Sequence, residues 1–280
     1  MEPNNALAEK YLDIVMQSNF PIEHYDKEYL FKVFDKLKNM NTAKLSNTGS
    51  EIVRNYHPSI WRCNIKDHPA PVDAWNDPEI MYKVICNRLK YLSREDLSLY
   101  NIRSGLTISK IAPKVSIFRP ALAKHLIKKY LEDYATVFDP CAGFSGRLLG
   151  ATALNKYYIG ADINSITVKE SNELIKDLKL NAKVYLDDSI YSIGTYDCLF
   201  TCPPYGDKEI WHQDIEVLST DEWLETCIKN FDCKKYLFVI DKTEKYNDYI
   251  VETIKNTSHF GTNSEKVVLI TEEDKAILKY

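Results

Sequence analysis

The chain has 280 residues, 45 % of them hydrophobic, and a formal net charge of −4 at pH 7. This length suffices for one α/β core and an accessory region of roughly 100 residues. No run approaches the ~18 consecutive apolar residues of a membrane helix, and the start MEPNNALAEK does not resemble a secretory signal, so we expect a cytoplasmic protein. The negative charge excludes a protein that coats nucleic acid indiscriminately, so nucleic-acid contact requires a local patch.

The cysteines indicate reduced thiols. There are seven of them, an odd number, and none forms a CxxC pair. A disulfide framework usually shows an even, paired set, and a structural zinc site usually shows close Cys/His pairs. We therefore predict no disulfide and no metal site.

The first 105 residues are predicted to be mainly helical. Residues 6–17 and 23–40 have apolar positions at helical spacing, and Asp77-Pro78 is typical of a cap and first position for a helix that runs to about residue 92. Between residues 54 and 77 the helical periodicity is interrupted by a proline-containing stretch. We interpret this stretch as a loop that contacts a partner molecule. Its candidate contact residues are Arg54, Tyr56, His57, Trp61, Arg62 and Trp75.

From about residue 106 short apolar runs alternate with helical segments. The predicted helix is 120–130, and the predicted strands are 135–138, 157–159, 183–186, 198–200, 236–240 and 267–270. Strands separated by helices predict an α/β fold with a mostly parallel sheet covered on both faces. The predicted domains are 1–105 and 106–280.

Three acidic positions follow the first three predicted strands. The sequence DPCAGFSGR begins at Asp139 and supplies glycines where a strand turns into a helix, which lets backbone approach a ligand closely. Asp162 ends the second apolar run 23 positions later, where a carboxylate can accept both hydroxyls of a ribose. Asp188 follows the third run and is a candidate for holding an adenine amino group. These spacings fit both a dinucleotide and S-adenosylmethionine.

The fourth motif separates these two ligands. It reads TCPPYG from Thr201, directly after the apolar run 198–200. Two prolines stiffen the backbone and remove two N–H donors, which leaves carbonyls able to accept hydrogen bonds from an amino group. Tyr205 supplies an aromatic face for a base rotated out of its stack. A purely structural turn is the alternative interpretation.

Together, DPCAGFSGR, GADIN, LDDS and TCPPYGDKE resemble the class I S-adenosylmethionine-dependent DNA amino-methyltransferases, with IFRPALA from residue 117 similar to the segment before the glycine turn. The resemblance covers roughly residues 106–270 and implies a Rossmann-like fold. It implies that the cofactor is held by Phe118, Arg119, Pro120, Asp139, Pro140, Cys141, Ala142, Gly143, Asp162, Ile163, Asp188 and Ser189. It implies a catalytic pocket of Thr201, Cys202, Pro203, Pro204 and Tyr205.

The sequence departs from the family in two places. The glycines of the turn are split as Gly143 and Gly146, where members often have GxG. Only about 75 residues follow the catalytic motif, so we expect target reading to fall to residues 1–105 and the 54–77 loop. A second candidate for nucleic-acid contact is a basic stretch between residues 107 and 133, with the alternative of a solvated helix face. Its cations are Lys110, Lys114, Arg119, Lys124, Lys128 and Lys129.

The resemblance implies transfer of a methyl group to N4 of cytosine or N6 of adenine in DNA. Hydrogen bonds from the amino group to Thr201 and to the carbonyl of Cys202 would aim the nitrogen lone pair, and a Thr in the first motif position leans slightly toward cytosine. A restriction partner is possible in this family. Two alternatives stay open: an RNA base methyltransferase, and a non-catalytic subunit that binds cofactor and DNA.

Overall fold

The computed structural model describes residues 5–41, 46–65, 67–92, 97–189, 191–203, 218–258 and 261–278. The described chain forms two compact units. The helical unit contains residues 5–24 and 58–116, and the sheet unit contains residues 25–57, 117–203 and 218–278. This division differs from the predicted boundary at residue 105. Residues 25–57 belong with the sheet because their two helices pack on the helices that cover it.

The helical unit is built from α1 (Asn5–Met16), η1 (Pro58–Arg62), α4 (Pro71–Trp75), α5 (Pro78–Leu89) and α6 (Leu99–Ile108). The start of α5 is as predicted. The carboxylate of Asp77 accepts the N–H groups of Glu79 and Ile80, which satisfies two amides that have no partner inside the helix. No described helix of either unit is long and apolar enough to cross a membrane.

The predicted contact loop at residues 54–77 is instead largely helical, and its two tryptophans are core residues. Trp61 and Trp75 are buried, and Phe20 packs against both rings. The guanidinium of Arg103 lies over Trp61, 4.4 Å from the ring centroid. The prolines that break the helical periodicity begin short helices here, and the tryptophans supply apolar area to the unit's interior. Arg62 is exposed.

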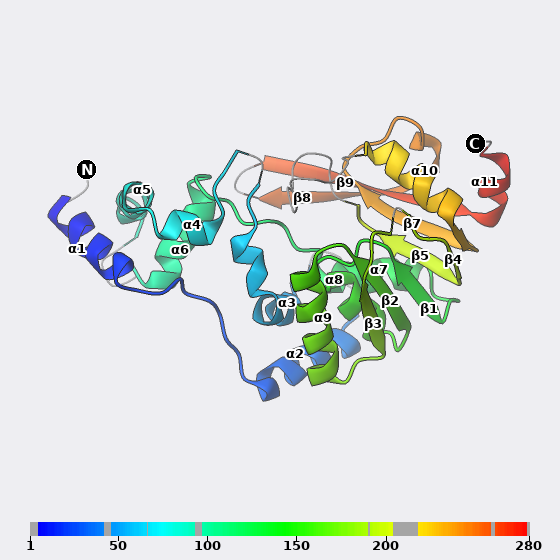
Figure 1. The fold of residues 1–280 in the computed structure, drawn as a ribbon, viewed down its shortest axis with the longest axis horizontal. Coiled ribbons are helices and arrows are strands. Elements are labelled where there is room, and N and C mark those ends of the chain that lie inside the picture. The colour runs from blue at the N-terminus through cyan, green and yellow to red at the C-terminus, as the bar shows by residue number, and fades with distance from the viewer. Residues whose placement is uncertain are drawn as a thin grey trace. The chain divides into compact units, whose positions relative to one another are not determined.

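The sheet unit contains a seven-stranded sheet in the order β3-β2-β1-β5-β7-β9-β8. Its strands are β1 (Thr136–Asp139), β2 (Tyr157–Asp162), β3 (Ala182–Leu186), β5 (Cys198–Thr201), β7 (Lys235–Ile240), β8 (Ile250–Ser258) and β9 (Gly261–Thr271). The five strands from β3 to β7 are parallel (Figure 1). A Rossmann-like α/β fold, as predicted, is confirmed.

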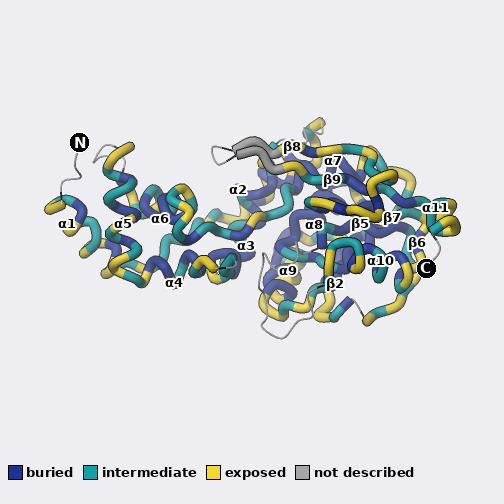
Figure 2. The backbone as a smooth tube through the Cα atoms, turned by 90° about the horizontal axis from the view of Figure 1, so that it is seen from above, coloured by how far each residue is buried: buried dark blue, intermediate teal, exposed yellow. Residues whose placement is uncertain are grey.

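The helices of the sheet unit are α2 (Lys27–Asn39), α3 (Ser50–Tyr56), α7 (Pro120–Tyr130), α8 (Gly146–Thr152), α9 (Ser165–Leu178), α10 (Thr220–Asn230), η3 (Asn247–Tyr249) and α11 (Glu272–Ile277). The predicted helix 120–130 coincides with α7. Every residue of α8 is buried, and its tube is dark blue in Figure 2. This burial follows from its composition of glycine, alanine, threonine and leucine around a single arginine.

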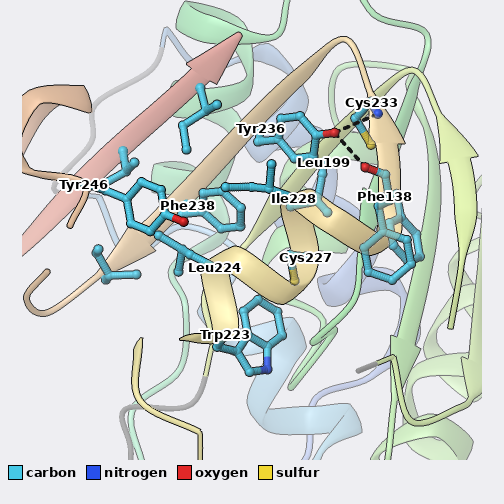
Figure 3. Packing of buried hydrophobic residues seen from close by; sticks show 14 residues of the cluster. Phe138, Leu199, Trp223, Leu224, Cys227, Ile228, Cys233, Tyr236, Phe238 and Tyr246 are labelled. Carbon is cyan, nitrogen blue, oxygen red and sulfur yellow. Dashed lines mark hydrogen bonds between the residues drawn. The ribbon is translucent and has the colours of Figure 1, made fainter. Parts of the chain in front are cut away.

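Consecutive residues of β1 show that helices cover both faces of the sheet. Phe138 belongs to the cluster that α10 contributes to, whereas Asp139 bonds Arg147 of α8. Successive side chains of a strand point to opposite faces, so α10 and α8 lie on opposite sides. On the α10 side, Figure 3 shows Leu224 and Ile228 of this helix facing the aromatic side chains of the strands.

The antiparallel edge of the sheet was not predicted. The strand predicted at residues 267–270 exists within β9, but it pairs antiparallel with β7 and with β8. β8 has the sequence IVETIKNTS and lies at the edge of the sheet. Its polar residues are typical of an edge strand with one solvated side, so it lacks the apolar run by which a buried strand is predicted. A separate parallel pair joins β4 (Gly194–Tyr196) to β6 (Phe231–Cys233).

The end of α2 is fixed by a lysine of α7. The ammonium of Lys124 donates hydrogen bonds to the carbonyls of Leu37, Lys38 and Met40 at 2.7–2.9 Å. These carbonyls lie at the C-terminus of α2, where the partial negative charge of the helix dipole favours a cation. Lys124 is only 4 % exposed, and burial lowers its pKa. It is therefore a capping residue and contributes no charge to a nucleic-acid surface.

Candidate active site at the carboxyl ends of the parallel strands

The order of the strands defines where a ligand binds in this sheet. From β1 the chain moves outward through β2 and β3, and from β5 it moves to β7 on the other side. The direction of winding therefore reverses between the neighbouring strands β1 and β5. In open α/β sheets, ligands bind at the carboxyl ends of the strands beside such a switch point. The DPCAGFSGR turn follows β1 and the TCPPY motif follows β5, so both predicted motifs flank it.

The turn after β1 is shaped by two residues with left-handed backbone. Gly143 has a φ of +54° and Ser145 a φ of +61°. A Cβ at Gly143 would be in ordinary van der Waals contact, with its nearest atom 3.8 Å away, so the positive φ and not a lack of room favours glycine there. A Cβ at Gly146 would lie 1.9 Å from the carbonyl oxygen of Phe118. The split glycines therefore serve different purposes: Gly143 permits the turn, and Gly146 permits the segment at Phe118 to pack against it.

Asp139 lies at the end of β1 and has no exposed surface. Its carboxylate accepts hydrogen bonds from Arg147 Nε at 2.6 Å, the Tyr158 hydroxyl at 2.6 Å and the Thr201 hydroxyl at 2.7 Å. The N–H of Cys141 also donates to it. Asp139 therefore connects α8, β2 and the TCPPY strand to the turn. Asp139 is therefore buried behind the turn and fixes the residues around it. The sequence suggested instead that Asp139 contacts the cofactor.

The electrostatics of this centre are dominated by the buried pair of Asp139 and Arg147. Burial alone would lower the pKa of the Arg147 guanidinium. The charge and hydrogen bond of the adjacent carboxylate, together with other neighbouring groups, raise this pKa by more than burial lowers it, so the guanidinium stays charged. Arg147 also donates a hydrogen bond to the carbonyl of Cys141. Burial, with the negative charge of Asp139, raises the pKa of the Tyr158 hydroxyl well above its ordinary value. That hydroxyl keeps its proton and acts as a donor.

Asp162 ends β2 and reaches back to the turn. Its Oδ2 accepts the N–H of Gly143 at 2.8 Å, and its Oδ1 accepts the N–H of Asn164 at 2.9 Å. Each carboxylate oxygen has a second lone pair, so two acceptor positions remain for hydroxyl donors. Burial raises the pKa of Asp162, while the two backbone hydrogen bonds act in the opposite direction. The arrangement suits the ribose contact predicted for this residue.

The region after β3 lies close to the turn. The hydroxyl of Ser189 donates to the carbonyl of Pro140 at 2.5 Å, and the side chain of Ser189 is buried. Asp188 is half-buried beside it, and Ile163, after β2, is exposed. The structure thus brings the predicted residues of three strand ends together around one turn.

The segment before α7 lies against the same turn. Phe118 packs edge-on against Phe200 of β5, with ring centroids 5.7 Å apart. The guanidinium carbon of Arg147 lies 5.1 Å from the centroid of Phe118. Arg119 precedes the helix and Pro120 occupies its first position, which is the preferred place for proline. Burial lowers the pKa of Arg119, opposed by the charge of Glu265.

The described part of the TCPPY motif ends at residue 203. Thr201 has no exposed surface and donates its hydroxyl to Asp139, so its side chain supports that carboxylate. Cys202 is half-buried, and Pro203 is buried. Pro204 and Tyr205 lie outside the described residues. A direct hydrogen bond from Thr201 to a base, as the sequence suggested, would have to compete with this contact.

The sequence analysis assigned no role to Arg147 or Tyr158, and it placed His57 in the loop expected to contact nucleic acid. The contact of Arg147 with Asp139 could have been predicted from the sequence. Arg147 stands eight residues after Asp139 in the same motif, and a helix that begins at Gly146 places it over the end of the strand. Tyr158 carries no comparable signal, since a tyrosine inside an apolar run reads as core. His57 bonds Ser145 of the turn, and the long separation in sequence hides that contact.

Among the cations of the predicted basic stretch, several have other partners. Lys124 caps α2, and Lys129 forms an ion pair with Glu252 at 2.8 Å. Lys114 lies over the ring of Trp61 at 5.3 Å from its centroid. Lys128 is exposed. The stretch is therefore not a uniform cationic face. Among the described residues, no cluster of three or more histidine, cysteine or carboxylate side chains forms a metal site.

No protein-family model and no curated protein matches the chain. Among solved structures, a Listeria monocytogenes protein provisionally assigned to the class I S-adenosylmethionine-dependent methyltransferases is 12 % identical over 89 % of this chain and 88 % of its own, with a TM-score of 0.46. A Streptococcus thermophilus rRNA methylase is 15 % identical over 56 % of this chain and 99 % of its own, with a TM-score of 0.38. A methyltransferase from Agrobacterium tumefaciens is 13 % identical over 57 % and 64 %, with a TM-score of 0.40. These likenesses are too distant to assign an activity.

Proposed function

We propose that this protein is an S-adenosylmethionine-dependent methyltransferase that acts on the exocyclic amino group of a nucleic-acid base. One observation carries the proposal. Asp139 joins the glycine-containing turn after β1 to the strand that ends in TCPPY, so a cofactor turn and an amino-accepting motif are built on one support. The two motifs flank the switch point of the sheet, where a donor and an acceptor molecule can meet.

The residues around the turn fit the cofactor. Asp162 has acceptor positions left for two ribose hydroxyls, and charge-assisted hydrogen bonds of this kind are among the strong ones. Gly143 carries no side chain, which lets a ligand approach the backbone of the turn. The segment at Phe118 closes against the other side of the turn. Asp188 stands beside Ser189, near Pro140, and is proposed to take the adenine amino group.

S-adenosylmethionine supplies a methyl group on a sulfonium that is already activated for in-line displacement. The protein then needs to align the amino nitrogen, and no strong general base is required. The carbonyl of Cys202, next to Pro203, would accept one amino hydrogen and direct the nitrogen lone pair. Thr201 would act through its hydrogen bond to Asp139, which fixes the position of the strand end. Stacking of the base on Tyr205 is proposed from the sequence.

We propose DNA as the substrate, with cytosine N4 or adenine N6 as the acceptor, because the TCPPY motif resembles the DNA amino-methyltransferases. The experiment is incubation with radiolabelled cofactor on duplex DNA, single-stranded DNA and RNA, followed by mass spectrometry of the nucleosides. Label in N4-methylcytosine or N6-methyladenine of DNA supports the proposal. Label only in RNA would show that RNA, and not DNA, is the substrate. Binding of cofactor without transfer to any of the three would favour the non-catalytic alternative.

Tyr205→Ala provides the matched test of the acceptor site. Loss of an aromatic stacking platform costs about 1–3 kcal/mol of base binding. We expect methyl transfer to fall at least about fivefold while the dissociation constant for S-adenosylmethionine stays within twofold. Near-normal transfer in this variant would show that the motif is a structural turn.

A further inference from the structure

His57 connects the N-terminal part of the sheet unit to the turn after β1. It follows α3, where its N–H caps the helix by donating to Val53, and Pro58 then prevents the helix from continuing. The imidazole is 0 % exposed. Its Nε2 lies 2.9 Å from the hydroxyl of Ser145, and its Nδ1 lies 3.1 Å from Glu170 Oε2. Its ring also packs edge-on against Phe144.

Ser145 is the residue of the turn that most needs such support. It holds a left-handed backbone conformation without being glycine, which costs roughly 1–2 kcal/mol. It occupies the cap position of α8, yet its side chain makes no capping hydrogen bond. Instead its hydroxyl bonds His57 and, at 2.9 Å, the hydroxyl of Ser171. The strained backbone of Ser145 is therefore held in place by the hydrogen bonds of its side chain to two buried residues.

Three hydrogen bonds link Glu170 through His57 and Ser145 to Ser171. A carboxylate only accepts, so the Nδ1 of His57 carries the proton toward Glu170. The Nε2 of His57 and the hydroxyl of Ser145 form the second bond, and the hydroxyls of Ser145 and Ser171 form the third. Each buried polar atom of the chain is satisfied by the next, and removing one member leaves a buried group without its partner. Glu170 and Ser171 both lie on α9, whose fixed position anchors the chain.

We propose that His57 is a positioning residue for the cofactor turn: through Ser145 it holds the backbone of residues 143–146 in the conformation that receives S-adenosylmethionine. The inference rests on the proposed function for the identity of the ligand, but not for the ordering of the turn. Groups behind a binding site commonly set its affinity by fixing the residues that touch the ligand. A loose turn would have to be ordered on binding, and this ordering would weaken the affinity.

Four variants test the role. His57→Ala removes the hydrogen bond to Ser145, whereas His57→Gln returns an amide that can form a hydrogen bond near the Nε2 position. Ser145→Gly removes the hydroxyl and the backbone strain together. The matched control is Tyr56→Phe, which removes the neighbouring 3.1 Å hydrogen bond to Asp177 of α9 without touching the turn.

Two readouts are measured in each folded variant: hydrogen exchange of the backbone amides of residues 141–147 without ligand, and the dissociation constant for S-adenosylmethionine. We expect His57→Ala to speed exchange of these amides and to weaken cofactor binding about tenfold, His57→Gln to recover part of both, and Tyr56→Phe to change neither. In the Ser145→Gly background, His57→Ala should have less than a threefold further effect on binding. A wild-type chain that does not bind the cofactor would refute the proposed function alone. Unchanged exchange in His57→Ala, or an equal change in Tyr56→Phe, would refute the positioning role.

Discussion

Arg147 Nε donates a 2.6 Å hydrogen bond to Oδ2 of Asp139, and both side chains are buried beneath the turn that carries the proposed cofactor site. Removing one partner of a buried ion pair leaves an uncompensated charge and costs about 3–5 kcal/mol. We expect Arg147→Met to lower the free energy of unfolding by this amount in urea denaturation.

The exposed pair of Lys32 and Glu28 is the control for this prediction, because surface pairs at four-residue spacing contribute only about 0.3–0.5 kcal/mol. Glu28→Gln should therefore change stability little. The double variant Asp139→Asn with Arg147→Met should be more stable than the sum of the single losses predicts. Strict additivity would show that the two charges do not stabilise each other.

The proposed ribose contact predicts a cofactor affinity that depends on pH. Burial raises the pKa of Asp162, so this carboxyl takes up a proton at a higher pH than the usual value of about 3.9. A protonated carboxyl loses the charge-assisted hydrogen bonds to ribose, so binding should weaken on acidification while the usual aspartates are still ionised. Calorimetric titration over a pH series measures this, and Asp162→Asn should flatten the profile.

At neutral pH, Asp162→Ala should weaken S-adenosylmethionine binding about tenfold or more, since a hydrogen bond to a charged group contributes roughly 1.5–3 kcal/mol. Asp187→Ala is the matched control, because Asp187 is exposed after the neighbouring strand and its carboxylate bonds Ser192. An unchanged affinity in folded Asp162→Ala would remove the basis for the ribose assignment.

The fold was predictable from the sequence where the chain's local pattern agrees with its final environment. The strands β1, β5 and β7 are buried on both faces and therefore show as apolar runs, and α7 starts at a proline and ends where its apolar face ends. The edge strand β8 shows no such run because only part of it is covered. The tryptophans at positions 61 and 75 were misinterpreted because a broken periodicity with aromatic residues can mean either an exposed contact loop or short helices packed into a core.

The positions of the candidate site residues in the fold were partly predictable, whereas their roles stay predictions. Residues that follow strands, such as Asp162 and Thr201, are found by position, because the carboxyl ends of parallel strands meet at one edge. The contact of His57 with Ser145 joins residues 88 positions apart and depends on how α3 packs, which no local pattern specifies. The same holds for Lys124, whose partners are main-chain carbonyls and carry no signature in the sequence.

Substitution of Lys124 distinguishes capping from nucleic-acid binding. Lys124→Met leaves the carbonyls at the end of α2 without their donor, which should cost about 1–3 kcal/mol of stability. Lys128→Met, an exposed neighbour on the same helix, should stay within about 0.5 kcal/mol of the wild type. Urea denaturation measures both. DNA affinity that falls more in folded Lys124→Met than in Lys128→Met would contradict the capping role.

The product should carry its new methyl on nitrogen. Methylation at cytosine C5 requires a thiolate that attacks the ring first. Burial raises the pKa of the Cys141 thiol well above its ordinary value, so this sulfur stays protonated at neutral pH. We expect Cys141→Ser and Cys202→Ser each to retain methyl transfer. Nucleoside mass spectrometry that detects 5-methylcytosine, lost in either variant, would overturn the mechanism.

The sheet unit is discontinuous along the chain, because residues 58–116 leave it after His57 and return at Ile117. A fragment that starts at residue 117 would retain every strand, yet it would lack α2 and α3. The ammonium of Lys124 would lose its three carbonyl partners, and Ser145 would lose His57. No single cut in the polypeptide can therefore release an intact sheet unit. Isolation of that unit requires a short linker that joins residue 57 directly to residue 117 in place of the inserted helices.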